Sequence, residues 1–401
     1  MLRQSVLHQP FSVGIGNASS NEVAIQKSLL LDIVNENHHL YQMEVRDRPN
    51  NIIRVLVELH KLGATQEQLS MAYQKTLLEV EPIRLSDSHK INERNWQEFL
   101  GLSSFYGDYL VFFDNQLSLL GLDETLDRYF YSIPPSMGSQ LQPIVQLAFG
   151  IEHDLPQIVT QALAYYTTSY LDVSSILDYC DDPASNSNSR ASQDALNTIL
   201  FDLIRADQRF DGKIEGYNTF QSAVKLLLKS KYDLLKTYVK TWSTLSDSES
   251  RLEALVFSAT TLYKMASRQQ HDAAHVDLDW FLASGQLIDA TLAIKQIMRP
   301  DFLEDWVNLL FLNTLCTYVV QGRPINNKNS KQQMEHTNFE SCTATILHNS
   351  LDPKLVLAFT SLLKVTEQYP HFSSLCLDVA NMLALFSKDG TWIKGGLGWT
   401  C

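Results

Sequence analysis

Apolar residues recur at intervals of three and four along most of the chain, which is the period of amphipathic helices. Residues 50–62 place apolar side chains on one side and polar side chains on the other, and Gly63 follows as a helix-ending residue. Thr65 and Gln68 then have the spacing of a capping box. These features predict two consecutive helices, each of which buries one face.

The stretch 137–166 predicts another pair of helices, separated by Pro156, which cannot continue the first of them. Pro143 suits the first turn of that helix, where a missing N–H costs nothing. One side of the helix is apolar, and the opposite side collects, at steps of four, three and four, Gln142, Gln146, Phe149 and His153. From spacing alone, the two glutamines are typical of a solvated face.

Further helical patterns cover much of the remaining chain, and no alternating strand pattern or internal repeat interrupts them. They span residues 21–33, 196–205, 220–242, 249–266, 355–365 and 375–386. Three stretches differ: an irregular segment 1–22, a Ser/Asn-rich linker 180–195, and a polar loop 325–345. We therefore expect an all-α fold, with residues 23–401 as a single large helical domain and a central cavity between packed helices.

The composition and charge of the chain indicate which kinds of molecule it can bind. The chain has 401 residues, 45% of them hydrophobic, and a formal net charge of −13. Nucleic acid and anionic membranes both call for clustered Lys and Arg, so the charge predicts neither as a partner. No apolar run is long enough for a transmembrane helix, and residues 1–20 lack the apolar core of a signal peptide. We expect a cytoplasmic protein, and a homodimer is left open.

Candidate metal ligands are few. The five cysteines are widely spread without a Cys-x-x-Cys motif, which indicates neither a zinc knuckle nor a disulfide framework. His271 and His275 lie four residues apart, which would put both rings on one side of a helix. No motif supplies a third ligand, so the interpretation favours a surface pair over a metal site.

The run from Gln142 to Glu152 resembles the signature of the questin oxidase-like family, in which a His-Pro-x-x-His pair leads into Gly-Tyr-Gly-x-Glu. Pro143, Gly150 and Glu152 match that signature. Gln142 and Gln146 stand at the two histidine positions. The departure from the family pattern therefore falls on the residues that would carry its chemistry.

Other segments resemble the family in the same order along the chain, roughly from residue 29 to residue 399. They include a helix at 50–57 and its Leu-Gly-Ala turn, a Trp-x-x-x-Leu-Gly run at 96–101, aromatic residues in 106–113, Asp-x-Phe-Leu at 279–282, and Tyr-Val-x-x-Gly-Arg-Pro at 318–324. In this register the further family histidines are replaced by Pro49, Asn51, Arg54, Val55 and Ser284.

The resemblance implies an oxygenase of secondary metabolism, because the family is largely fungal and acts on anthraquinones and related aromatic polyketides. Some members are understood to hold a mononuclear iron through histidines from three of these helices. Amide and hydroxyl side chains hold Fe(II) poorly, so the replacements imply no metal here. No Gly-x-Gly-x-x-Gly follows a strand and no Gly-x-Ser-x-Gly occurs, so no cofactor and no serine nucleophile are expected.

The resulting expectation is a metal-free oxidoreductase that uses O2 for Baeyer–Villiger-type oxidation or ring opening of an anthraquinone or hydroquinone polyketide. Such a reaction needs a base and oxyanion donors. His153 or His371 is the expected base. The expected substrate-binding residues are Asn51, Tyr106, Gln142, Gln146, Phe149, Glu152 and Ser284.

Two other interpretations stay open. The first is a catalytically silent family member that has kept a ligand pocket or an interaction surface, since lost histidines are what degeneration would leave. The second is an enzyme of another class that uses the pair His271 and His275. A structural test of the main interpretation is whether Asn51, Gln142, Gln146 and Ser284 line one closed cavity.

Overall fold

The computed structural model describes residues 20–85, 91–178, 192–212, 219–269, 275–325 and 337–399. Within these ranges the chain folds into sixteen α-helices and five short strands, which confirms the all-α prediction. The helices are α1 (Ser20–Leu40), α2 (Ile52–Lys61), α3 (Gln66–Leu77), α4 (Tyr106–Tyr129), α5 (Gln142–Glu152), α6 (Pro156–Thr168), α7 (Ser174–Leu177), α8 (Ser192–Asn197), α9 (Phe220–Ser230), α10 (Tyr232–Ser243), α11 (Ser248–Met265), α12 (Gln286–Ile297), α13 (Pro300–Val320), α14 (Phe339–Asn349), α15 (Pro353–Gln368) and α16 (Ser373–Asp389).

The strands form two small sheets. They are β1 (Glu44–Val45), β2 (Arg48–Pro49), β3 (Ser267–Gln269), β4 (Val276–Asp279) and β5 (Thr391–Ile393). β1 and β2 form an antiparallel hairpin, whereas β4 pairs antiparallel with β3 and parallel with β5. The sequence analysis predicted no strand, because segments of two to four residues are too short to display a two-residue period.

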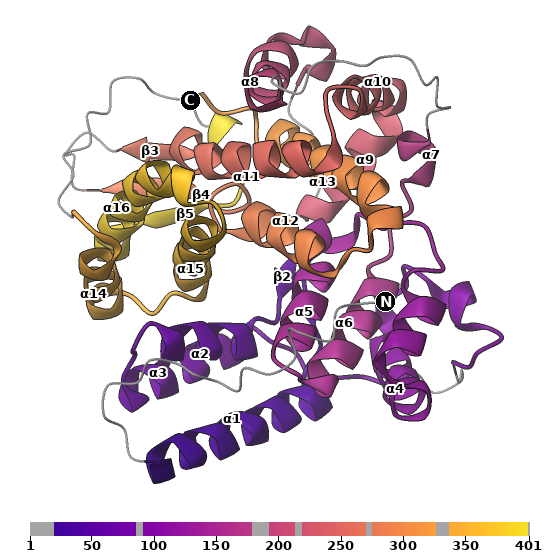
Figure 1. Cartoon of the computed structure of the whole chain (residues 1–401), viewed down its shortest axis with the longest axis vertical. Coiled ribbons are helices and arrows are strands. Elements are labelled where there is room, and N and C mark those ends of the chain that lie inside the picture. The colour runs from indigo at the N-terminus through magenta and orange to yellow at the C-terminus, as the bar shows by residue number, and fades with distance from the viewer. Residues whose placement is uncertain are drawn as a thin grey trace.

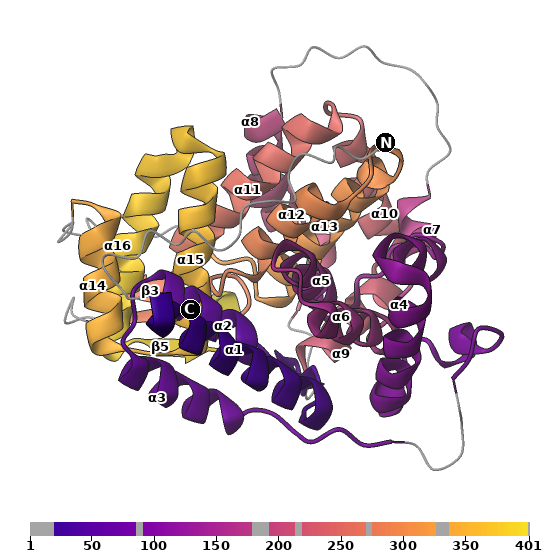
Figure 2. The ribbon, with the colours of Figure 1, turned by 60° about the horizontal axis from the view of Figure 1, so that its bottom comes forward.

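The antiparallel pair α5 and α6 occupies the middle of the fold, with α4 packed on α6 and α12 packed on α5 (Figure 1). Gly150 permits this pairing, because a Cβ there would come within 2.9 Å of the Val159 backbone nitrogen. Helices α14–α16 form a separate group, and α2 packs against α15 of that group (Figure 2). Helix α5 thus has neighbours on most sides, so both its faces are buried.

This burial corrects one interpretation. Gln142 and Gln146 are each only 4% exposed, so the solvated face suggested by spacing alone is wrong. Helices α6 and α12 both pack against α5, and nearly every residue of α5 is buried, the glutamines included. A stripe of amides inside a protein needs hydrogen-bond partners, which directs attention to what surrounds α5.

Several boundaries differ from expectation. Residues 1–19 and 179–191 lie outside the described residues, and α8 begins at Ser192 within the expected linker 180–195. Helix α14 begins at Phe339, inside the stretch expected to be a polar loop at 325–345. The capping box of Thr65 and Gln68 is confirmed at the start of α3. No helix in the described ranges is long and apolar enough to cross a membrane.

Candidate active site

A small polar recess lies where the β1–β2 hairpin, the turn before α5, α9 and the start of α12 meet. It is lined by Glu44, Asp47, Pro49, Ser139, Gln140, Gln142, Tyr165, Phe220, Gln221 and Gln286. Its water-accessible volume is about 10 Å³, which is room for about one water molecule. Two positions at which the family carries histidines, Pro49 and Gln142, belong to this lining.

The turn that leads into α5 is left-handed. Ser139, Gln140 and Leu141 have φ of 48°, 52° and 63°, although none of them is glycine. A left-handed conformation costs a non-glycine residue about 1–2 kcal/mol, so three in succession persist only where surrounding contacts enforce them. Strain of this kind is concentrated at functional sites in proteins.

Side chains from distant helices stabilise this turn. In the orientation that satisfies its hydrogen bonds, the Gln221 amide oxygen accepts from the backbone N–H groups of Ser139 at 2.8 Å and Gln140 at 3.0 Å. The Gln140 amide donates to the Thr317 hydroxyl at 3.3 Å. These contacts fix the turn between α9 and α13 and bring Ser139 and Gln142 to the recess.

Glu44 is the titratable group with the most altered acidity in the recess. Burial raises the pKa of its carboxyl to about 7, the neighbouring Asp47 also raises it, and the Ser139 hydroxyl, which donates to Glu44 Oε2 at 2.6 Å, opposes the shift. The residue as a whole keeps part of its surface exposed, while its carboxyl group is enclosed by protein atoms. A carboxyl with this pKa can gain and lose a proton near neutral pH.

Three further polar groups of the recess are sealed from water without a hydrogen-bond partner in the described part of the chain. They are the Tyr165 hydroxyl, the Gln142 side-chain nitrogen and the Gln286 side-chain oxygen. An unsatisfied buried polar group costs about 1–3 kcal/mol. Two donors and one acceptor around one space therefore indicate a place that is completed by water or by a polar ligand.

The hairpin that carries Glu44 is attached to α9 through Asp47. Its carboxylate accepts from the backbone N–H groups of Phe220 at 2.6 Å and Gln221 at 3.3 Å, at the positive end of the helix. Arg46 and Asp47 both have positive φ, the geometry of a two-residue turn that usually contains Asn or Gly. The position of Glu44 thus depends on a short, strained turn, on the contact of Asp47 with α9 and on its own hydrogen bond from Ser139.

Asp279 positions the segment that enters α12. Its carboxylate accepts from the backbone N–H groups of Phe281 at 3.0 Å, Leu282 at 3.1 Å and Leu397 at 2.9 Å. The Phe281 ring then stacks on Phe220 with centroids 4.0 Å apart. These contacts position the segment that runs through Ser284 to Gln286, which lines the recess.

A buried ion pair involves Arg54 of α2, which stands at another of the family histidine positions, and Asp289 of α12. The Arg54 guanidinium lies 2.6 Å from the Asp289 carboxylate, which also accepts from the Ser361 hydroxyl at 2.7 Å. Asn51, an expected substrate-binding residue, accepts from Arg54 at 3.3 Å. A fixed cation beside Asn51 and Val55 does not fit a metal ion. No group of three or more His, Cys, Asp or Glu within the described ranges is placed to hold one.

The main interpretation expected one closed cavity to be lined by four residues, namely Asn51, Gln142, Gln146 and Ser284. They do not all line the recess. Gln142 lines it, and Asn51 contacts Arg54 instead. Gln146, one turn further along α5, is buried but does not line the recess, and nor does Ser284, whose buried hydroxyl has no partner in the described chain. The structure therefore brings one of the four to the recess lining.

The remaining expected residues lie elsewhere. His153 caps the opposite end of α5, about 16 Å from Gln142 by helix rise, with its ring 4.5 Å from that of Phe149. Burial lowers the pKa of His153. The Glu152 side chain is 44% exposed. Tyr106 is buried at the start of α4, away from the recess lining.

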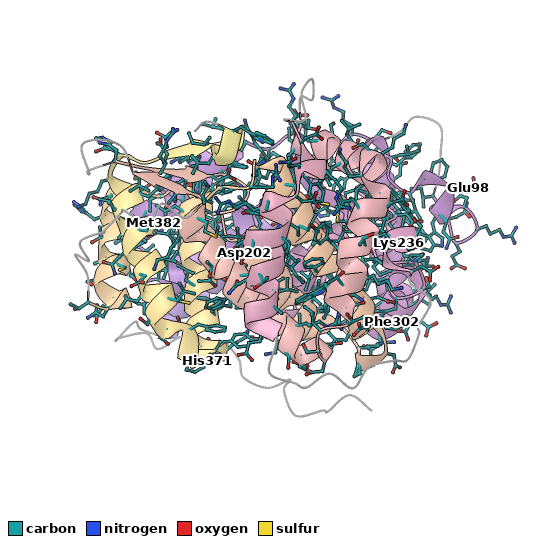
Figure 3. The ribbon with its side chains drawn as sticks, turned by 90° about the horizontal axis from the view of Figure 1, so that it is seen from above. Glu98, Asp202, Lys236, Phe302, His371 and Met382 are labelled. Carbon is teal, nitrogen blue, oxygen red and sulfur yellow. The ribbon has the colours of Figure 1, made fainter. Side chains whose placement is uncertain are left out.

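The other histidines do not approach the recess either. His371 lies at the outer edge of the molecule (Figure 3), where its ring nitrogen is 2.8 Å from the Glu253 carboxylate. His271 lies outside the described residues. His275 is 4.0 Å from Asp389. The expected bases that the structure describes thus lie away from the recess.

Sequence reasoning missed most residues of the recess, among them Glu44, Ser139, Tyr165 and Gln286. Glu44 sits on a strand of two residues, which carries no periodic signal. Gln286 follows Ser284 by two positions, so the family register pointed close to it. Tyr165 lies on the buried helix α6, where an aromatic residue gives no signal that separates it from the core.

A family model described as questin oxidase-like matches residues 49–361. Among curated proteins, a Baeyer-Villiger oxidase of Pestalotiopsis microspora is 23% identical over 189 residues, which is 43% of this chain and 42% of that protein. Questin oxidase of Aspergillus terreus is 23% identical over 231 residues, 54% of this chain and 51% of the relative. A Baeyer-Villiger monooxygenase of a Cryptosporiopsis species is 28% identical over 172 residues, 39% and 38% of the two chains. The matches thus span about half or less of the relatives' length.

Proposed function

This chain belongs to the questin oxidase-like family, and on that premise we propose that it is an oxidoreductase that oxidises an aromatic small molecule with O2. Two of the relatives are named for Baeyer–Villiger chemistry and one for questin oxidation, which supports this class of reaction. The finer proposal is insertion of one oxygen atom into, or opening of, a ring of an anthraquinone-like hydroquinone polyketide.

The reaction balances without a metal when the substrate itself supplies the electrons. A hydroquinone loses two electrons and two protons, one oxygen atom of O2 enters the ring system, and the other leaves as water. The protein then has to remove a phenolic proton, which makes the ring electron-rich, and to stabilise the oxyanion that develops. An iron centre at the family histidine positions is disfavoured because Arg54 occupies that region together with Asp289.

The observation that carries the proposal is the group of side chains at the recess. Glu44 is the proposed base, because its carboxyl exchanges a proton near neutral pH and adjoins the Tyr165 hydroxyl. Tyr165 and Gln142 supply donors for the oxyanion, and Gln286 supplies an acceptor for a substrate hydroxyl. Glu44 takes the role that the sequence analysis gave to His153 or His371, neither of which reaches the recess.

The proposal requires the recess to open. It now holds about one water molecule, whereas pockets for drug-sized ligands measure roughly 300 Å³ or more. The element most suited to move is the β1–β2 hairpin, because each of its strands has only two paired residues and its turn is attached to α9 through the Asp47 carboxylate. Movement of this hairpin would enlarge the recess on the side that carries Glu44 and Pro49.

The small recess also favours a second candidate function. A family member that has lost its chemistry would retain the helices and close its cavity with side chains, as the Arg54–Asp289 pair does on α2. Such a protein would bind an aromatic ligand or a partner without oxidising it. The two candidates differ in whether O2 is consumed.

Oxygen uptake separates them. Protein dialysed against a chelator is mixed with an emodin-type hydroquinone in an oxygen electrode, with Glu44→Gln as the test variant. Glu98→Gln is the matched control, because Glu98 is exposed at the periphery (Figure 3). We expect uptake by wild type and by E98Q, and a loss of about 10²–10⁴-fold in E44Q.

Other results assign the protein differently. Tight binding of anthraquinone without oxygen uptake supports the silent family member. Uptake that disappears on chelation and returns with Fe(II) contradicts the metal-free reaction. Equal uptake by wild type and E44Q contradicts the role of Glu44.

A further inference from the structure

Lys354 is a buried cation in an unfavourable position. It is the second residue of α15, after the cap residue Asp352 and Pro353, and is only 8% exposed. The first turn of a helix carries partial positive charge, which disfavours a cation there. Burial without a counter-ion disfavours it further. A residue that breaks both rules has a compensating partner or a function.

The Trp280 ring is the one contact that the described structure provides for this ammonium. Lys354 Nζ lies 4.1 Å from the ring centroid, and Lys394 Nζ lies 4.2 Å from the same centroid. Neither ammonium has a hydrogen-bond or carboxylate partner in the described part of the chain. Two cations beside one indole repel each other, so the ring compensates only part of their burial.

No carboxylate of the described residues forms an ion pair with either ammonium, although Asp352 and Glu79 attract both. Asp352 Oδ1 accepts from the backbone N–H groups of Lys354 and Leu355 and from the Trp392 indole N–H. The cations of Arg54 and Arg48 act in the opposite sense on Lys354 and Lys394, respectively. Two ammonium groups thus lie beside one indole without a carboxylate in direct contact.

We propose that Lys354 and Lys394, beside Trp280, bind an oxyanion, either a carboxylate or a phosphate, carried by a small molecule. Lys394 is exposed and supplies access, while Lys354 supplies the buried, water-poor contact. Such a site is distinct from the recess, because none of Lys354, Lys394 and Trp280 lines the recess. The inference does not depend on the proposed oxidation.

The site has a defined pH dependence. Burial lowers the pKa of Lys354 to about 7, opposed by the carboxylates of Asp352 and Glu79 and assisted by the cations of Lys394 and Arg54. Only the protonated amine attracts an anion. Affinity should therefore be greatest below pH 7 and fall by up to about tenfold for each pH unit above it.

The test measures binding of inorganic phosphate and of acetate, with sodium chloride at equal ionic strength as the reference. Calorimetric titration gives the affinity, and the rise of Tm with anion concentration reports the same binding. Lys354→Met and Lys394→Met are the test variants. Lys240→Met is the matched control, because Lys240 is an exposed lysine on α10.

We expect phosphate, acetate or both to bind wild type and K240M beyond the chloride reference, and to bind K354M and K394M at least about tenfold more weakly, as expected for loss of a charge-assisted contact. Binding of only one of these two anions shows whether the site takes a phosphate or a carboxylate. No binding beyond chloride, or equal binding by wild type and both lysine variants, would overturn the proposal. K394M keeps the test decisive if K354M folds poorly, because residue 394 is on the surface.

Discussion

At the scale of single residues, the protonation state of the Glu44 carboxyl decides whether it can accept a proton in the recess. Its pKa is raised from 4.5 to about 7 in the folded protein, mainly by burial. Ionisation is therefore easier in the unfolded chain, so stability falls as pH rises from about 4.5 to about 7 and then levels off. One pKa unit corresponds to about 1.4 kcal/mol, so the effect is at most about 3 kcal/mol, less the screening from its exposed part.

Glu44→Gln removes this titration. We expect the difference in unfolding free energy between E44Q and wild type to move in favour of E44Q by up to about 3 kcal/mol from pH 4.5 to pH 8. Urea unfolding of both proteins at several pH values measures it. Parallel pH profiles for the two proteins would show that Glu44 has an ordinary pKa.

Arg54 and Asp289 form the second decisive contact at this scale. Removing one member leaves an uncompensated buried charge, so Asp289→Ala should lower the unfolding free energy by about 3–5 kcal/mol. Replacing both members, with Arg54→Met and Asp289→Leu, should cost much less. Chemical denaturation of the single and double variants tests this, and equal losses in both would contradict a coupled pair.

At the scale of elements, the β1–β2 hairpin is the proposed route of access to the recess. Asp47→Ala removes its contact with the first N–H groups of α9, so the hairpin should open more often. Loss of a capping carboxylate costs about 0.5–2 kcal/mol. Arg46→Ala is the control, because it places alanine in the same turn, also at positive φ, and retains the Asp47 contact.

Hydrogen exchange followed by mass spectrometry measures this opening. Peptides that cover residues 41–50 and the start of α9 should exchange faster in D47A than in R46A or wild type. Unchanged exchange in D47A would mean that other contacts position the hairpin, and the proposed route of substrate entry would lose its support.

The helices themselves could be predicted, because their signals are local. The capping residues Thr65 and Gln68, the prolines that begin α5 and α6, and the three-to-four periodicity all act within one or two turns. The recess could not be predicted in the same way. Its parts come from a two-residue strand, a left-handed turn and the first residue of α12, which only tertiary packing brings together.

At the scale of the whole molecule, the family register leads to two residues of the recess and not to the others. Gln142 and Pro49 line the recess, but Arg54 pairs with Asp289 and the expected bases, His153 and His371, lie far away. Spacing alone also placed Gln142 and Gln146 in solvent, because a sequence does not show how many helices surround a given helix. Burial of polar residues is decided by that packing.

The replaced histidines lead to a prediction for the intact protein. Because Arg54 places a fixed cation among those positions, removal of metal should leave the fold unchanged. Dialysis against a chelator should alter neither Tm nor the circular dichroism spectrum, and metal analysis should find no stoichiometric iron. A clear fall in Tm on chelation, reversed by Fe(II), would show a metal site that this account lacks.

The central claim is that the recess beside Glu44 oxidises an aromatic substrate with O2 and without a metal of its own. Isotope labelling tests it most directly: chelator-dialysed protein is incubated with a hydroquinone under ¹⁸O2, and the product is analysed by mass spectrometry. The account predicts a product that contains one ¹⁸O atom, formed by wild type and E98Q but not by E44Q. A product without label, or labelled product formed equally by E44Q, would contradict it.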